Sequence, residues 1–168
     1  MDKEVKTKSK PEEVKEEIRM DEKITVTSIA PWTTGFRRIL TVGDVQIQPN
    51  GNVRLSREEV IAQAQSGNKL ISGTDGMGTH ATLYIEDAWT RKELEYDTEE
   101  STQIVVSKKM VKDMFDSKTL ASFKKSVEKN IVTRAEKYYL LSMIRSLKIN
   151  DYEKIAFCEE YCGAKLNA

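Results

Sequence analysis

Hydrophobic and polar positions follow two different periods along this chain, and the change falls near residue 106. The run Ile24 to Thr27 alternates apolar and polar side chains, which is the pattern of a half-buried β-strand. Further β-type runs occur at 36–42, 45–48, 52–55, 69–71, 81–85 and 103–106. The sequence therefore predicts six or seven short strands between residues 23 and 106.

Turn and cap signals separate these runs. Asn50-Gly51 is a strong hairpin signal, and it predicts that the runs on its two sides, 45–48 and 52–55, pair as antiparallel strands. Ser56 and Glu59 have the spacing of a capping box, so a short helix should follow and end near residues 67–68. Asp87 can cap a second short helix.

After Ser107 the apolar residues recur at helical spacing. The predicted helices are Ser107–Phe115, Lys118–Lys129, Thr133–Ile149 and Asn150–Tyr161. The pairs Thr133/Glu136 and Asn150/Glu153 suit helix starts, and Gly163 suits a helix end. The third helix is apolar around much of its circumference, so it should be central to a bundle or covered by a partner.

These patterns predict an α+β protein in three regions. Residues 1–22 are charge-dense and should be a charged N-terminal arm, flexible on its own. Residues 23–106 should form a small antiparallel or mixed β-sheet, or a small barrel. Residues 107–168 should form an α-helical C-terminal subdomain.

Charge and composition limit the function classes. The 168 residues carry zero net charge, but residues 107–168 hold 13 basic and 8 acidic side chains and residues 23–106 hold 8 and 11. The apolar runs are too short to span a bilayer, and the N-terminus has no apolar signal region. We expect a soluble protein made in the cytoplasm, with no membrane partner. Cys158 and Cys162 continue an apolar helical stripe, so we expect buried free thiols.

The segment Gly73 to Ala81 is the most unusual stretch of the chain, because it holds three of the eight glycines and the only histidine. Its candidate contact residues are Gly73, Asp75, Gly76, Gly78 and His80. A phosphate-binding glycine loop normally leads onto a helix and ends in Lys-Ser/Thr. Because this loop leads into a predicted strand, we favour a self-packed or protein-contact loop over a small-molecule site.

No catalytic constellation accompanies this loop. His80 has no nucleophile elbow near it, and cysteines on an apolar helix are poor nucleophiles. We therefore expect a structural or surface histidine, no catalytic residues and no cofactor. Among the adjacent carboxylate pairs, only Glu86-Asp87 follows a strand close to the loop, and it is the one metal candidate retained.

Two tryptophans stand at the ends of predicted elements, where contact residues are common. Trp32 has Arg37 and Arg38 nearby in the sequence, a mixture also found in single-strand binders. Trp89 lies in the second short helix. We favour protein contact for all four residues, with nucleic-acid binding as the alternative, supported by exposed cations from the C-terminal helices. These cations are Lys108, Lys109, Lys112, Lys118, Lys124 and Lys125.

The preferred functional interpretation is a non-enzymatic structural or assembly protein that contacts protein partners or forms a homo-oligomer. Arms and loops that reach neighbours are typical of subunits of larger machines. A bacteriophage virion component, from head, neck or tail, is the specific expectation, with the virion as its location. A nucleic-acid-binding accessory protein is the alternative, and a small-ligand-binding protein using the Gly73–His80 loop is the third hypothesis.

Overall fold

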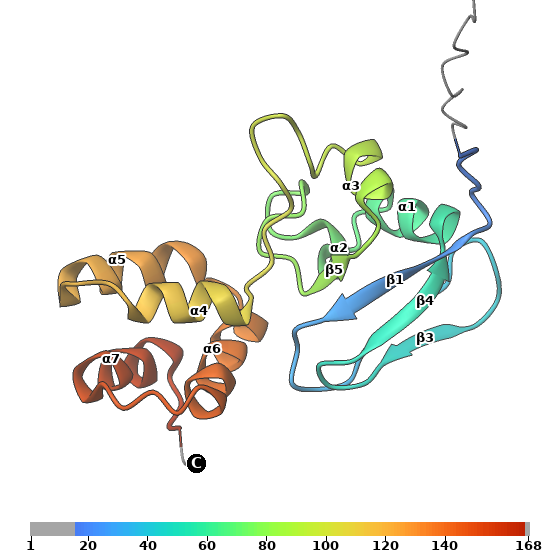
Figure 1. Ribbon diagram of the computed structural model, residues 1–168. Helices are drawn as coiled ribbons and strands as arrows, with labels where there is room; N and C mark the ends of the chain where they lie inside the picture. The colour runs from blue at the N-terminus through green and yellow to red at the C-terminus, as the bar shows by residue number, and fades with distance from the viewer. Residues whose placement is uncertain (1–15, 167–168) are drawn as a thin grey trace, which may run out of the picture.

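A computed structural model describes residues 16–166 (Figure 1). Most of the predicted N-terminal arm, residues 1–15, lies outside the described residues. Figure 1 shows a sheet-containing part beside a part made of helices, with the chain crossing between them ahead of α4. The predicted α+β fold with a helical C-terminal part is confirmed. The division into two subdomains at residues 106 and 107 stays a prediction.

The strands form two antiparallel sheets in the described part of the chain, and neither closes into a barrel. The first has the order β4-β1-β5, and the second is a hairpin of β2 and β3. The strand bounds are Lys23–Ser28 for β1, Thr34–Arg37 for β2, Asp44–Ile47 for β3, Asn52–Ser56 for β4 and Leu83–Ile85 for β5. Alternate residues of β1 are buried, as the alternation predicts.

The hairpin predicted around Asn50-Gly51 is wrong. β3 pairs with β2, and β4 pairs with β1. The turn docks instead on the chain at the end of β1: Asn50 N–H donates to the Ala30 carbonyl, and Ser28 N–H donates to the Gly51 carbonyl, each at 2.8 Å. These bonds direct the chain from one sheet into the other. The Asn50-Gly51 signal therefore predicted that the chain reverses here, but not which strands pair with each other.

Two predicted strands are absent from the described residues. Residues 69–71 lie in a short helix, α2 (Lys69–Ser72), because the Asn68 side chain accepts from Leu70 N–H and starts a helical turn. Residues 103–106 have no ladder partner; instead, Gln103 Oε1 accepts from Ile85 N–H at 3.4 Å at the edge of β5. The Gln103 side chain thus accepts a hydrogen bond at the edge of β5, where the backbone of a further strand was expected.

The two helix starts predicted in the β-rich part are confirmed. Ser56 caps α1 (Arg57–Gln65), and Asp87 caps α3 (Ala88–Glu93). The apolar residues of the sheets and these helices share one hydrophobic cluster. Its fully buried members include Val26, Ile47, Leu55, Val60, Ile71, Leu83 and Ile85.

The C-terminal helices follow their predicted positions closely. They are α4 (Lys108–Phe115), α5 (Leu120–Asn130), α6 (Arg134–Ser146) and α7 (Tyr152–Cys162). Thr133 and Glu136 form the predicted capping box, and Gly163 ends α7 in the left-handed region. The cap of α7 is Asp151 and not Asn150, because the Asp151 side chain accepts from Lys154 N–H.

The two cysteines are free thiols in the helical core. Cys158 is fully buried, and burial raises the pKa of its thiol to about 12. Cys162 is half-buried, and burial raises its pKa to about 11. Because the thiolate is the reactive form, both thiols are inert at neutral pH. The predicted apolar stripe is confirmed.

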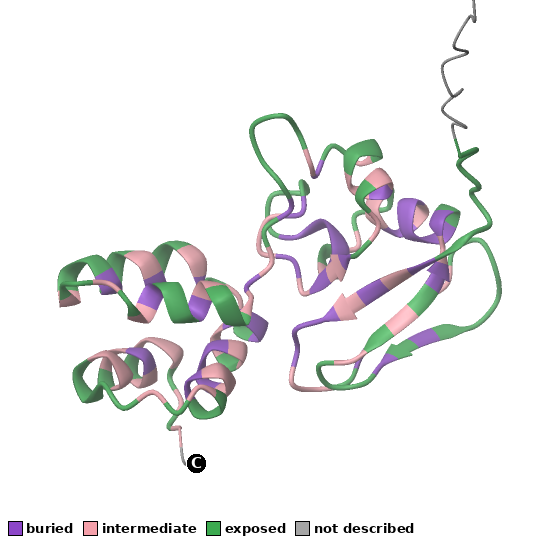
Figure 2. Ribbon diagram, viewed as in Figure 1, coloured by how far each residue is buried: buried purple, intermediate pink, exposed green. Residues whose placement is uncertain are grey.

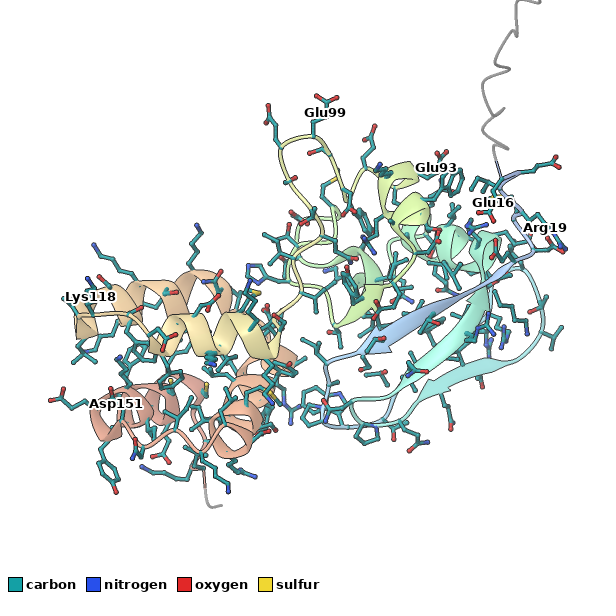
Figure 3. All side chains as sticks on the ribbon, in the orientation of Figure 1. Glu16, Arg19, Glu93, Glu99, Lys118 and Asp151 are labelled. Atoms are coloured by element: carbon teal, nitrogen blue, oxygen red, sulfur yellow. The ribbon has the colours of Figure 1, made fainter. Side chains whose placement is uncertain are left out.

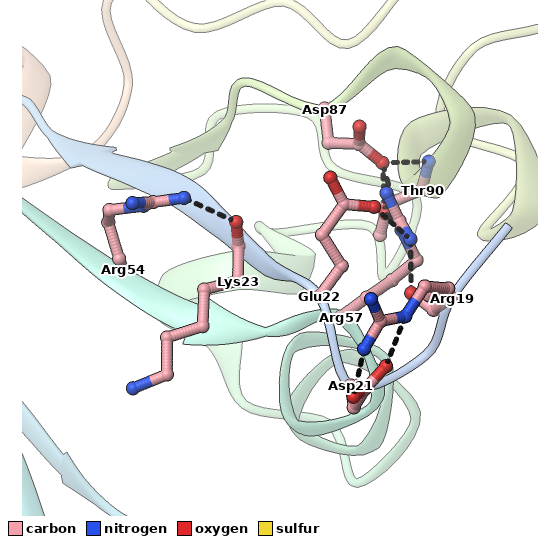
Figure 4. Close-up of polar contacts among 8 residues, drawn as sticks. All are labelled: Arg19, Asp21, Glu22, Lys23, Arg54, Arg57, Asp87 and Thr90. Atoms are coloured by element: carbon pink, nitrogen blue, oxygen red, sulfur yellow. Dashed lines mark hydrogen bonds and ion pairs between the residues drawn. The ribbon is translucent and has the colours of Figure 1, made fainter. Parts of the chain in front are cut away.

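Residues 16–22 are tied to the sheet part through the buried guanidinium of Arg57 (Figure 4). Arg57 donates to Asp87 at 3.3 Å, to Glu22 at 3.2 Å and to the Arg19 carbonyl. It also lies 5.4 Å from the centre of the Trp89 ring. The network joins the end of the predicted arm to α1 and α3.

Candidate contact surfaces

The Gly73–Ala81 loop closes on itself. Thr74 N–H donates to the Thr79 carbonyl at 2.9 Å, and Gly78 N–H donates to the Ser72 carbonyl at 2.7 Å. The Asp75 carboxylate accepts from the N–H groups of Met77 and Thr79 at 2.8 and 3.2 Å. Burial would raise the pKa of Asp75, but these hydrogen bonds lower it below its ordinary value. Four N–H groups of this loop, those of Thr74, Met77, Gly78 and Thr79, are therefore engaged within the protein.

Two of the three glycines are required by packing. A Cβ at Gly73 would stand 2.1 Å from the Thr79 carbonyl oxygen, and one at Gly78 would stand 2.8 Å from Cδ2 of Tyr96. All three have positive φ, but a Cβ at Gly76 would meet nothing within 4 Å. The glycines at the two ends of the loop permit close contact within the protein, which accounts for their presence without a ligand.

His80 joins the loop to the helical part. Its Nδ1 lies 2.9 and 3.0 Å from the two carboxylate oxygens of Glu136. Glu136 is 1% exposed, and it also accepts from Thr133 N–H at 2.9 Å at the start of α6. His80 itself has a φ of +56°. A strained residue held by a buried carboxylate supports the expectation of a structural histidine.

A different loop presents apolar side chains outward. Residues 38–43, here called the hairpin tip, join β2 to β3 and were predicted to continue a strand. Ile39 is 48%, Leu40 51% and Val42 101% exposed. Residues 39–43 are all exposed, and Figure 2 shows the loop leading into β3 in the colour of exposed residues. Three apolar side chains clustered on one surface loop are the composition of an interaction site.

The hairpin tip is held rigidly by a buried carboxylate. Glu59 on α1 is 2% exposed and accepts from Ile39 N–H at 2.7 Å and from Leu40 N–H at 2.9 Å. Gln63 Nε2 donates to Glu59 at 2.9 Å and to the Arg37 carbonyl at 2.8 Å. Burial would raise the pKa of Glu59, but these hydrogen bonds and the Arg38 charge lower it. The predicted capping box is therefore half-formed. The Ser56 side chain accepts from Glu59 N–H, but the Glu59 carboxylate binds the hairpin tip instead of the Ser56 backbone.

The structure separates the other candidate contact residues. Arg37 faces Asp44 at 3.9 Å beside the hairpin tip. Trp32, at the opposite end of β2, packs against Tyr138 of α6 with ring centres 5.7 Å apart and lies under Arg134. The mixture of Trp32 with Arg37 and Arg38 seen in the sequence is therefore not one surface, and Trp32 serves the junction between the two parts.

An open cleft of about 720 Å³ lies between the sheet and the helices. Its walls come from the end of β1, from β5, from the crossing segment 102–107 and from α4 and α6. Apolar groups dominate the lining, among them Ile29, Ile104, Val105, Met110 and Met143. No local sequence pattern predicts this cleft, because its lining residues come from five separate segments of the chain.

One polar group of the cleft lacks a partner. Gln103 lines the cleft and is 7% exposed, and its Nε2 has no hydrogen-bond acceptor among the described residues. Its Oε1 is engaged by Ile85 N–H. A buried donor without an acceptor costs about 1–3 kcal/mol. The nitrogen itself is fully buried, so it lies behind the wall of the cleft and is not open to an occupant of the cleft.

The metal candidate Glu86-Asp87 has other partners. Asp87 accepts from Thr90 and Arg57 (Figure 4), and although burial would raise its pKa, these hydrogen bonds lower it. Glu86 instead accepts from Thr27 Oγ1 at 2.9 Å. Within residues 16–166, no group of three or more His, Cys, Asp and Glu side chains is placed to hold a metal ion.

Comparison with known proteins gives no relative: no protein-family model matches the chain, and no curated protein or solved structure shows significant similarity. None of the helices among residues 16–166 has the length and apolar character to cross a membrane.

Proposed function

We propose that this chain is a non-enzymatic structural subunit that acts through protein–protein contacts made by the hairpin tip. The observation that carries the proposal is that Ile39, Leu40 and Val42 are exposed on a loop whose Ile39 and Leu40 N–H groups are held by the buried Glu59. Exposing such a cluster to water is unfavourable. Holding it in one conformation lowers the entropy lost on binding, so a rigid apolar tip is suited to docking in a partner.

A bacteriophage virion component remains the specific form of this proposal. It draws on the charge-dense N-terminal region and on the exposed surface loops. Head, neck and tail subunits make repeated contacts with neighbouring copies or with other subunits, and a rigid tip serves either kind of contact.

The size of purified full-length protein tests the proposal. Light scattering over a concentration series, with negative-stain imaging, should show species larger than a monomer. Val42→Asp should abolish them, because Val42 is fully exposed and its replacement disturbs only contacts made outside the chain. Val132→Asp makes the same change at another exposed valine, in the turn before α6, and should leave assembly intact.

Met77→Asp separates the hairpin tip from the glycine loop as the contact surface. Met77 is 45% exposed on the glycine loop. If Met77→Asp prevents assembly while Val42→Asp does not, the contact surface is the glycine loop and the tip proposal fails. A wild-type monomer at every concentration would contradict self-assembly altogether.

Nucleic-acid binding is the second candidate, because all six lysines considered in the sequence are exposed on or beside α4 and α5. Figure 3 shows Lys118 at the end of the helical part far from the sheet. Arg37 and Arg38 lie on the hairpin of the other part, so the cations do not form one continuous stripe. Filter binding across a salt series tests this candidate, since phosphate contacts give a steep loss of affinity with salt.

The third hypothesis is a small ligand bound in the Gly73–His80 loop. It gains no support from the structure of the loop, because several of its N–H groups are already bonded within the protein.

A further inference from the structure

We propose that the hairpin tip of one copy docks in the cleft of a second copy, so that the subunits join head to tail. This inference rests on the proposed function, and it names the partner of the same tip. It assigns a second copy of this chain as the occupant of the cleft.

The apolar surfaces of the two sites match. The tip presents Ile39, Leu40 and Val42, and the cleft offers walls that include Ile104 and Met143. Ile104 is 53% exposed, so each surface alone leaves large apolar groups in water. Covering both at once is favourable by about 25 cal/mol for each Å² of apolar surface removed from water.

Charge points to the same pairing. Glu86 is the only charged side chain in the lining of the cleft, and it faces no cation within the described part of the chain. Arg37 and Arg38 flank the tip, and Arg37 is strongly exposed with a long contact to Asp44. An arginine entering beside the tip would meet the unpaired carboxylate at the rim. Such rim charges set orientation and association rate more than affinity.

The geometry requires two copies. The anchor of the tip, Glu59, follows Ser56, which pairs with Lys23 at the start of β1. The cleft begins at Thr27 and Ile29, at the other end of β1. Five residues of strand separate these ends by roughly 17 Å, so a tip cannot enter the cleft of its own chain. A contact between two different surfaces repeats from copy to copy, giving a ring or a filament.

The single contact should be weak. A loop of six residues buries less than the roughly 800 Å² per partner of a standard interface. A closed ring gains stability because the last contact forms within one particle. Assembly should therefore depend strongly on protein concentration and should include few species between monomer and closed particle.

A mixing experiment tests the pairing with full-length protein. Val42→Asp removes the tip, and Ile104→Asp charges the cleft at a half-exposed position that the fold tolerates. Each variant alone should remain monomeric. At the highest protein concentration, where a single weak contact is populated, an equimolar mixture should give a species of twice the monomer mass, because one copy keeps the tip and the other the cleft. Val132→Asp alone, which keeps both surfaces, should assemble like the wild type and is the control for a surface charge; circular dichroism melts verify folding.

The possible results distinguish a failure of tip-to-cleft docking from a failure of the proposed function on which it rests. The dimer in the mixture, and its loss when both substitutions are placed in one chain, supports tip-to-cleft docking. If Ile104→Asp assembles like the wild type while Val42→Asp does not, the tip binds elsewhere; the inference is overturned and the proposed function stands. If the wild type never exceeds a monomer, or Val42→Asp assembles normally, both fail.

Discussion

The glycine loop and the hairpin tip are both surface loops, yet they use their backbone N–H groups in opposite ways. In the glycine loop, Asp75 binds the N–H groups of its own turn, and the loop is closed within itself. At the hairpin tip, the N–H groups are bound by Glu59, a residue of α1 some twenty positions later. The first loop is stabilised locally, whereas the second is held from the protein interior.

This difference explains why the more conspicuous sequence is the poorer contact candidate. Glycines and a lone histidine attract attention, but Gly73 and Gly78 serve close packing and His80 serves a link to α6. The tip has no motif, yet its support from a distant carboxylate leaves three apolar side chains free to face a partner. Support from a buried side chain, here Glu59, makes a surface loop suited to contact a partner.

The largest loss of stability should come from a substitution that opens the glycine loop. Gly73→Ala places a Cβ 2.1 Å from the Thr79 carbonyl at a φ of +74°, so the loop must be rebuilt, and we expect a loss of about 4 kcal/mol in the free energy of unfolding. Gly76→Ala is the matched control, with a φ of +78° and no neighbour within 4 Å. It should cost only the left-handed penalty of about 1–2 kcal/mol. Urea unfolding measures both.

Equal losses for the two variants would contradict the packing argument, because both share the backbone strain and only one has the clash. The glycine loop would then be mobile and free to rearrange on a ligand. Its closure on itself, and its contrast with the hairpin tip, would no longer hold.

The sequence predicted the elements better than it predicted their partners. Caps at Ser56, Asp87 and Thr133 are local signals, and all three begin helices. Strand pairing depends on contacts far apart in the chain, so the turn at Asn50-Gly51 was assigned to the wrong sheet. Propensity also failed at residues 69–71, where one cap at Asn68 outweighed a short apolar run.

The candidate surfaces could be predicted only in part. Arg37 and Arg38 lie on or next to the hairpin that carries the tip, but the exposed tip between them and β3 looked like an apolar strand in the sequence. Glu59 was interpreted as a cap residue, since nothing local reveals that its carboxylate reaches Ile39. The cleft arises where five segments meet, and only the three-dimensional fold brings them together.

A smaller effect is expected from loosening the hairpin tip. Glu59→Gln replaces one acceptor oxygen by an amide that opposes an N–H donor, and it should cost about 2 kcal/mol in the free energy of unfolding. Glu58→Gln, on the exposed side of the same helical turn, should change it by less than about 0.5 kcal/mol. Hydrogen exchange should show faster exchange at Ile39 and Leu40 in the first variant only.

The same variant should change how stability depends on pH. The pKa of Glu59 is lower in the folded protein than its ordinary value, so the folded state is favoured above that ordinary value. This contribution falls as pH decreases from about 4.5 through the folded pKa, because the protonated carboxyl no longer accepts both N–H groups. Glu59→Gln should lack this part of the acid destabilisation. An unchanged acid profile would mean that the tip does not depend on the carboxylate.

The smallest effect should come from the link between the glycine loop and α6. His80→Asn suits the left-handed backbone at this position, because Asn tolerates positive φ, but its shorter side chain cannot maintain the contact with Glu136. Glu136 keeps its bonds to Thr133, so the expected loss is only about 1 kcal/mol. Hydrogen exchange should increase at the start of α6, while the amides of Ile39 and Leu40 remain protected. Faster exchange at the tip as well would show that the two loops are coupled through the fold, and the contrast between a locally closed loop and one held from the interior would have to be abandoned.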